Sequence, residues 1–94
     1  MILPVKYNDL SIEGKRQVRT EYTKLQKGLC LHCHAPLDSD VDEITKEAWP
    51  VNKKLFPRDF FKWPVHLHHS HDSGLTLGAV HSYCNAVLWQ YHGE

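Results

Sequence analysis

The chain has 94 residues and equal numbers of acidic and basic side chains, 11 of each, together with eight histidines and three cysteines. A chain of this length forms one domain and buries only about 60–65% of the surface that its unfolded form exposes, so a bound metal would stabilise its small core. No apolar run could span a bilayer or resembles a signal peptide, and three cysteines cannot all pair, which together predict a soluble intracellular protein without a membrane partner.

A net charge of zero argues against nucleic-acid binding, but the charges are distributed unevenly. Residues 1–28 and 53–62 are basic, whereas acidic residues concentrate between Asp38 and Glu47. This pattern would place a positive face against DNA, although ordinary solvated surfaces explain it equally well. The candidate DNA contacts in the two basic segments are Lys15, Arg16, Arg19, Lys54, Arg58 and Lys62.

The first half of the chain predicts a helix and a metal-binding turn. Ser11 has the chemistry of an N-cap for a helix running to about Lys27, and Gly28 is a suitable residue to end it. Residues 29–37 then predict a knuckle between two short strands. Residues 42–49 form either a short helix or a loop before Pro50. The aromatic segment 56–64 predicts a lid over the core, which we favour over a platform for stacked bases.

The last third predicts a hairpin followed by a helix. Residues 65–69 alternate as a strand, residues 71–74 have turn chemistry, and residues 75–80 read as the returning strand. Asn85 is expected to cap a final helix over residues 86–92, with Gly93 just past its end. The predicted class is therefore a small α+β domain, with a basic helix in residues 1–28 and a zinc-stabilised core in residues 29–94.

Two sets of side chains could each hold a metal. Cys30, Cys33, His81 and Cys84 form two pairs, each with two intervening residues, which is typical of structural zinc, although His32 or His34 could replace one ligand. A second set has no thiolate and suits a catalytic cation at phosphate; its members are His68, His69, His71 and Asn85. Adjacent strand residues point to opposite faces, so His68 and His69 can share one site only where the strand twists, bulges or ends. His66 is a lesser candidate for the same site.

The motif His69-Ser70-His71-Asp72-Ser73-Gly74, followed by Gly78 and then His81-x-x-Cys84-Asn85, resembles the HNH endonucleases, in particular the branch that includes the phage recombination endonucleases. The resemblance runs roughly from Gly28 to the C-terminus with a gap through the middle. His68 and Ser70 stand where the family has Asp, and His81 replaces the first cysteine of the second knuckle.

This resemblance implies a ββα-metal core and a metal-dependent endonuclease of phage or mobile-element type that hydrolyses DNA. Neutral His69 would be the general base, and His71 either a second catalytic histidine or a turn cap. His68 and Asn85 would hold magnesium, manganese or another transition metal, although Asn85 could merely cap its helix. The alternatives are a non-catalytic zinc-knuckle DNA-binding module and a metal-binding interaction domain without DNA. A homodimer through the N-terminal helix is a further expectation.

Overall fold

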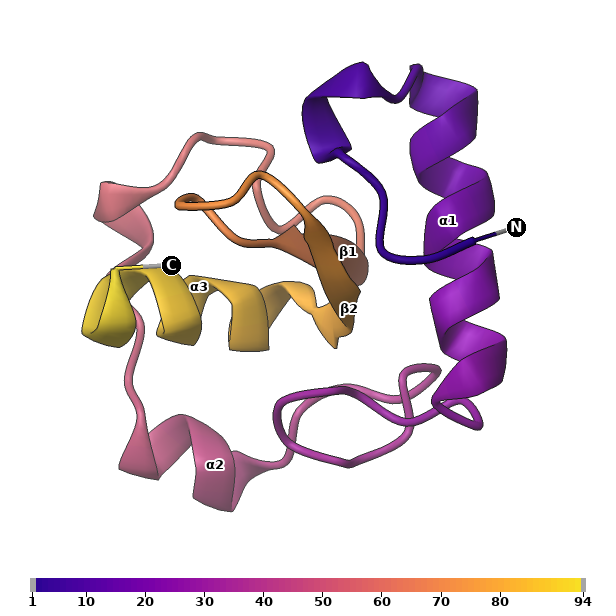
Figure 1. The fold of residues 1–94 in the computed structure, drawn as a ribbon. Helices are drawn as coiled ribbons and strands as arrows, with labels where there is room; N and C mark the ends of the chain where they lie inside the picture. The colour runs from indigo at the N-terminus through magenta and orange to yellow at the C-terminus, as the bar shows by residue number, and fades with distance from the viewer. Residues whose placement is uncertain (1, 94) are drawn as a thin grey trace.

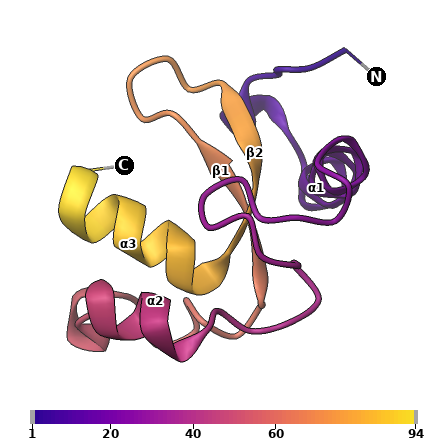
Figure 2. The same ribbon diagram turned by 90° about the horizontal axis from the view of Figure 1, so that it is seen from below.

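The computed structural model describes residues 2–93, which form a two-stranded sheet with helices on both sides. The hairpin of β1 (Val65–His69) and β2 (Thr76–His81) lies between α1 (Ile12–Leu25) and α3 (Ser82–His92), as Figure 1 shows. The short helix α2 (Glu43–Ala48) runs beside α3 (Figure 2). Two 3-10 turns, η1 (Tyr7–Asp9) and η2 (Lys53–Leu55), complete the elements, and the architecture confirms the predicted small α+β class.

The helix α1 begins where its capping residue predicts. Ser11 Oγ accepts a hydrogen bond from the Gly14 amide at 3.0 Å, which satisfies one of the unpaired N–H groups of the first turn. The helix ends at Leu25, slightly before the expected Lys27. Lys27 and Gly28 then take positive φ angles of 58° and 77°, and the Gly28 amide donates to Thr23 O at 2.8 Å. Because Gln26 is the C-cap, the left-handed C′ residue is Lys27, and the predicted C′ position of Gly28 is one residue too late; Gly28 closes the cap through its bond to Thr23.

The segment after the knuckle contains the short helix that the sequence left open. Asp42 Oδ1 accepts a hydrogen bond from the Thr45 amide at 2.7 Å, so an acidic N-cap starts α2. The knuckle itself has no flanking strands among the described residues. It is closed instead by a single bridge between Leu29 and Pro36.

The hairpin contains a bulge at the two adjacent histidines. His68 pairs with Gly78 and His69 with Thr76, so Leu77 is an extra residue in β2. Leu77 is exposed whereas both of its neighbours in the strand are buried. A bulge twists a ladder and changes the direction of nearby side chains. The strand therefore has the irregularity that His68 and His69 need in order to reach one site.

The final helix starts earlier than the sequence suggested. α3 begins at Ser82 with His81 at the N-cap position, so the predicted start at Ala86 and the capping role of Asn85 are wrong. The Ser82 amide donates to Pro64 O at 2.8 Å. The His81 ring makes no capping hydrogen bond, and its Nε2 lies 2.9 Å from Pro36 O instead. At the other end Gly93 ends the helix as predicted, with a φ of 72°.

The core lies where α1, the hairpin and the knuckle meet. Its buried side chains include Val18 and Tyr22 from α1, Leu67 from β1, and Val80 from β2. The Tyr22 hydroxyl lies 3.0 Å from Thr76 Oγ1 and donates to Thr76 O at 3.2 Å. No helix in residues 2–93 has both the length and the apolar character needed to cross a membrane.

Gln26 joins α1, the knuckle and β2 through one side chain. Its Oε1 accepts from the Ala79 amide at 2.8 Å, and its Nε2 donates to Ala79 O at 2.9 Å and to Leu29 O at 2.8 Å. The residue before Ala79 is a glycine, Gly78. A Cβ at this position would lie 2.7 Å from both Gln26 Oε1 and Leu31 Cδ2, so a larger residue would clash with both side chains. The amide of Gln26 thus takes the place of a third strand along this part of β2.

We expect Gln26→Ala to lower the free energy of unfolding by about 1–3 kcal/mol, because it leaves both backbone groups of Ala79 without this partner. The matched control is Gln17→Ala, which removes an exposed glutamine of α1 and should change stability by less than about 0.5 kcal/mol. Chemical denaturation of the two variants measures the difference. Equal free energies of unfolding for Gln26→Ala and Gln17→Ala would show that the Gln26 contacts contribute nothing to stability.

Candidate metal centre and histidine pocket

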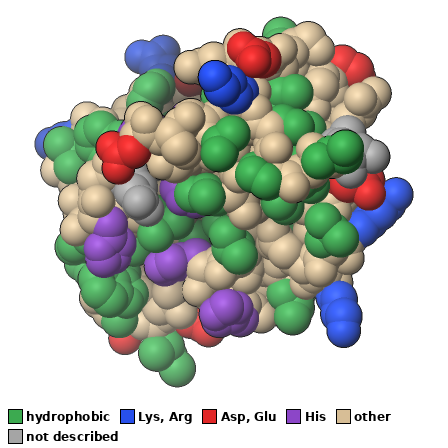
Figure 3. All heavy atoms as spheres, viewed as in Figure 1, with side chains coloured by type: hydrophobic (Ala, Val, Ile, Leu, Met, Phe, Trp, Pro, Cys, Tyr) green, Lys and Arg blue, Asp and Glu red, His purple; other side chains and the backbone are tan. Residues whose placement is uncertain are grey.

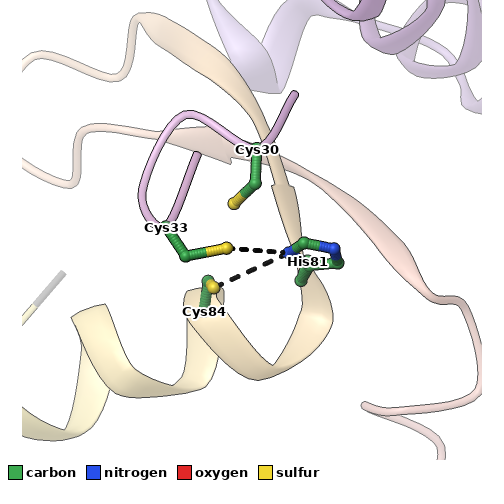
Figure 4. Close-up of side chains that lie close together, drawn as sticks. All are labelled: Cys30, Cys33, His81 and Cys84. Atoms are coloured by element: carbon green, nitrogen blue, oxygen red, sulfur yellow. Dashed lines mark hydrogen bonds between the residues drawn. The ribbon is translucent and has the colours of Figure 1, made fainter. Parts of the chain in front are cut away.

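Four side chains from three parts of the chain converge on one point, as Figure 4 shows. Cys30 and Cys33 come from the knuckle, His81 from the end of β2 and Cys84 from the first turn of α3. Their ligand atoms all lie within 4.8 Å of one another. A zinc tetrahedron with Zn–S bonds of about 2.3 Å has edges of about 3.8 Å. The four residues named by the sequence spacing therefore form a cluster that could hold zinc.

The ring of His81 is oriented for metal binding. Its Nε2 lies 2.9 Å from both Pro36 O and Ser39 O, and because carbonyl oxygens only accept, the ring proton is on Nε2. Nδ1 therefore carries the lone pair, and it faces Cys33 Sγ at 3.3 Å and Cys84 Sγ at 3.8 Å. Such backbone contacts on the far nitrogen are typical of histidine ligands.

The pKa values of Cys30 and Cys84 are shifted in opposite directions. A hydrogen bond from the Cys84 thiol lowers the pKa of Cys30 to about 4 against the effect of burial, and backbone N–H groups including that of Cys33 add to the lowering. The same interaction, with burial, raises the pKa of Cys84. One thiolate is thus favoured at neutral pH, which is the form that binds a metal.

A separate pocket brings together the second set of residues that the sequence singled out. Its volume is about 430 Å³ and its lining includes His68, His69, His71 and Asn85, together with His66. His68 is only 4% exposed, and the bulge beside it lets both His68 and His69 contribute to the pocket. The pocket therefore contains all the residues proposed for the catalytic site.

The ring of His69 is fixed by a residue that the sequence analysis did not identify. Tyr7 stacks on it with 3.8 Å between ring centroids and 9° between planes, and Lys15 Nζ lies 4.3 Å from the centroid of the Tyr7 ring. Backbone pairing holds Tyr7 in place, since its amide donates to Gly74 O at 2.9 Å. Burial and the nearby His71, His68 and Lys15 lower the pKa of His69, which keeps its imidazole neutral at pH 7.

Asn85 is oriented by His66, which the sequence offered only as a lesser candidate for the same site. Asn85 Nδ2 lies 3.0 Å from His66 Nδ1, and because an amide NH₂ only donates, Nδ1 accepts. Burial lowers the pKa of His66 and so favours its neutral ring. With Nδ2 bound to His66, the atom of Asn85 left for a cation is its carbonyl oxygen. The capping role that the sequence allowed for Asn85 is replaced by this contact.

The candidate DNA contacts come from two segments, α1 and the stretch between α2 and β1. Lys15 and Arg19 of α1 line the histidine pocket, whereas Arg16 forms an ion pair with Glu13 at 3.5 Å. The other three, Lys54, Arg58 and Lys62, are exposed in the segment between α2 and β1 and do not line the pocket. On the face in Figure 3, histidines lie among hydrophobic side chains while lysines and arginines lie toward the margins. The basic residues thus form no continuous patch on that face.

Comparison of the chain with models of protein families, with curated proteins and with solved structures finds no match. The functional assignment therefore depends on the site itself.

We expect the purified protein to contain about one zinc per chain, and Cys30→Ser or Cys84→Ser to lose the metal together with the cooperative unfolding transition, because binding and folding are coupled in such sites. The matched control is His34→Asn. His34 lies in the same knuckle at a φ of 65°, a conformation that Asn tolerates, and it is outside the cluster. Elemental analysis and thermal unfolding measure both effects, and zinc-free, folded wild-type protein would contradict the assignment.

Proposed function

We propose that the protein is a metal-dependent DNA endonuclease of the HNH type that hydrolyses phosphodiester bonds. The observation that supports this most is the histidine pocket, where His68, His69, His71 and Asn85 meet beside a bulged strand. These residues are also the ones that the resemblance of the motif marks as catalytic. A zinc-binding module alone has no need for this second set of nitrogen and oxygen donors.

In this proposal His69 activates the attacking water. A neutral imidazole accepts a proton from water as the water oxygen bonds to phosphorus, and the bond from phosphorus to the 3′ oxygen breaks. The lowered pKa of His69 keeps the required neutral form, and the stacked Tyr7 holds the ring in one plane. His71 lies 5.1 Å from His69 between ring centroids, close enough to donate a hydrogen bond to an oxygen of the same phosphate.

His68 and Asn85 are the residues that would hold a cation. Bound there, a divalent cation would stabilise charge on the phosphate and on the departing oxygen. The contact with His66 presents the carbonyl oxygen of Asn85 as a ligand. An imidazole in place of the family's carboxylate favours manganese, cobalt or nickel over magnesium.

We expect His69→Ala to reduce cleavage of supercoiled plasmid by about 100- to 10,000-fold in manganese, because it removes the general base. Zinc content and DNA affinity should stay close to those of the wild type. The control is His92→Ala, an exposed histidine in the last turn of α3, which should cleave normally. Gel electrophoresis of time courses gives the rates.

Cleavage by His69→Ala at the wild-type rate in every metal tested would refute the assignment of this pocket. The protein would then be better described as a zinc-stabilised DNA-binding module with a structural histidine cluster.

We expect Arg19→Ala to weaken DNA binding and to reduce the slope of log affinity against log salt concentration by about 0.7–0.9, as for the loss of one phosphate contact. Lys24→Ala on the same helix is the matched control, because Lys24 is exposed, lies outside the pocket and is not one of the candidate DNA contacts. Titrations at several salt concentrations distinguish the two. Identical slopes for Arg19→Ala and the wild type would remove Arg19 from the interface.

A further inference from the structure

The histidine pocket has an aromatic wall in addition to its ionisable groups. Phe60, Trp63 and Trp89 line it beside the histidines, and Tyr7 lines it next to His69. Trp63 is 65% exposed and Trp89 46% exposed. Tryptophan is highly buried on average, so two exposed indoles at one pocket are candidates for contact with a ligand.

The aromatic residues of the wall differ in how firmly they are packed. Phe56 contacts Phe60 at 4.7 Å and Trp89 at 5.6 Å between ring centroids, and Phe60 contacts His66 at 4.8 Å. These rings pack against α3 and His66 and are not among the residues packed on the core cluster, so the lid over the core predicted for residues 56–64 is not borne out. Trp63 extends beyond these rings, although the Pro64 carbonyl that follows is fixed by the Ser82 amide at 2.8 Å. Trp63 therefore presents an exposed ring from an anchored backbone.

The charge of the pocket identifies the ligand that would lie against this wall. Among the described lining residues, the ionisable side chains are histidines, Lys15, Arg19 and the Tyr7 phenol, and none is a carboxylate. A chain with zero net charge thus concentrates only basic and neutral groups here. The volume of about 430 Å³ lies within the range of pockets that hold small organic ligands. An anion with an attached flat ring matches both features.

We propose that the pocket takes an unpaired nucleotide, with its base stacked on Trp63 and its phosphate directed toward the histidines, Lys15 and Arg19. This inference depends on the nuclease function proposed above and names its substrate class as single-stranded or locally unpaired DNA. In a duplex each base is already stacked between its neighbours, so its face cannot reach an indole. Duplex DNA could offer the pocket only its phosphates.

The test measures the affinity of three fluorescent probes of about 15 nucleotides, a length that covers the site of a typical single-strand binder. The probes are a thymidine strand, a duplex containing that strand and a strand of the same length made of abasic residues. Binding to zinc-loaded protein is followed by anisotropy with no other divalent cation added, so that cleavage does not interfere. The variants are Trp63→Ala, Trp63→Phe and the control Trp49→Ala, which removes an indole 41% exposed outside the pocket.

Trp63→Ala should weaken binding of the thymidine strand by about 5- to 150-fold, the effect of losing one stacked base, and leave duplex affinity unchanged. Trp63→Phe should keep most of the affinity, and Trp49→Ala should match the wild type. The wild type, Trp63→Phe and Trp49→Ala should all prefer the thymidine strand to the abasic strand by such a factor, whereas Trp63→Ala should lose that preference.

Equal loss of single-strand and duplex affinity in Trp63→Ala, or no loss at all, would overturn the stacking proposal while leaving the nuclease proposal intact. Failure of the folded wild type to bind any of the three probes would overturn both proposals. Zinc content and the unfolding midpoint of each variant establish that it is folded.

Discussion

The convergence of Cys30, Cys33, His81 and Cys84 on one point is the constraint on which the rest of the structure depends. A two-stranded hairpin is marginal by itself in water, and a chain of 94 residues has little apolar surface with which to hold it. The cluster joins the knuckle, the end of β2 and the first turn of α3. A metal there would fix the relative positions of these three segments.

The position of the cluster along the hairpin explains how it influences the histidine pocket. His81 pairs with Val65 at the first residue of β1, whereas His69 pairs with Thr76 at its last. These two pairs are separated along β1 by about 13 Å, at the usual rise of a strand. A metal at one end would therefore fix the register that places the bulge at the other. The Gln26 contacts to Ala79 attach α1, which carries Lys15 and Arg19, to the same strand.

The pocket also shows how a chain without net charge could attract a polyanion. The acidic residues concentrate between Asp38 and Glu47, and no residue of that segment lines the pocket. Within this acidic segment, Lys46 Nζ lies 2.8 Å from Asp40 Oδ2, so part of the negative charge is neutralised locally. Lys15 and Arg19 are the lysine and arginine side chains that line the pocket, and screening reduces the influence of more distant exposed charges.

The sequence by itself determined the features that depend on local pattern. The spacing of Cys30, Cys33, His81 and Cys84 identified the metal cluster, the alternation in residues 65–69 identified β1, and Ser11 identified the start of α1. The strand alternation and the helix cap are patterns among residues a few positions apart. The metal ligands can be recognised even when they are far apart in the sequence, because few residue types bind zinc.

Only the tertiary structure decided which distant side chains support the site. Tyr7 stacks on His69, His66 orients Asn85 and Gln26 binds Ala79 across stretches of sequence that carry no signal for these contacts. The start of α3 was mispredicted for the same reason. Asn85 is a good capping residue, but the helix begins at Ser82, where the cluster needs His81 and Cys84 on one turn. Local preference is worth about 1 kcal/mol at a cap, and contacts distributed through the fold outweigh it.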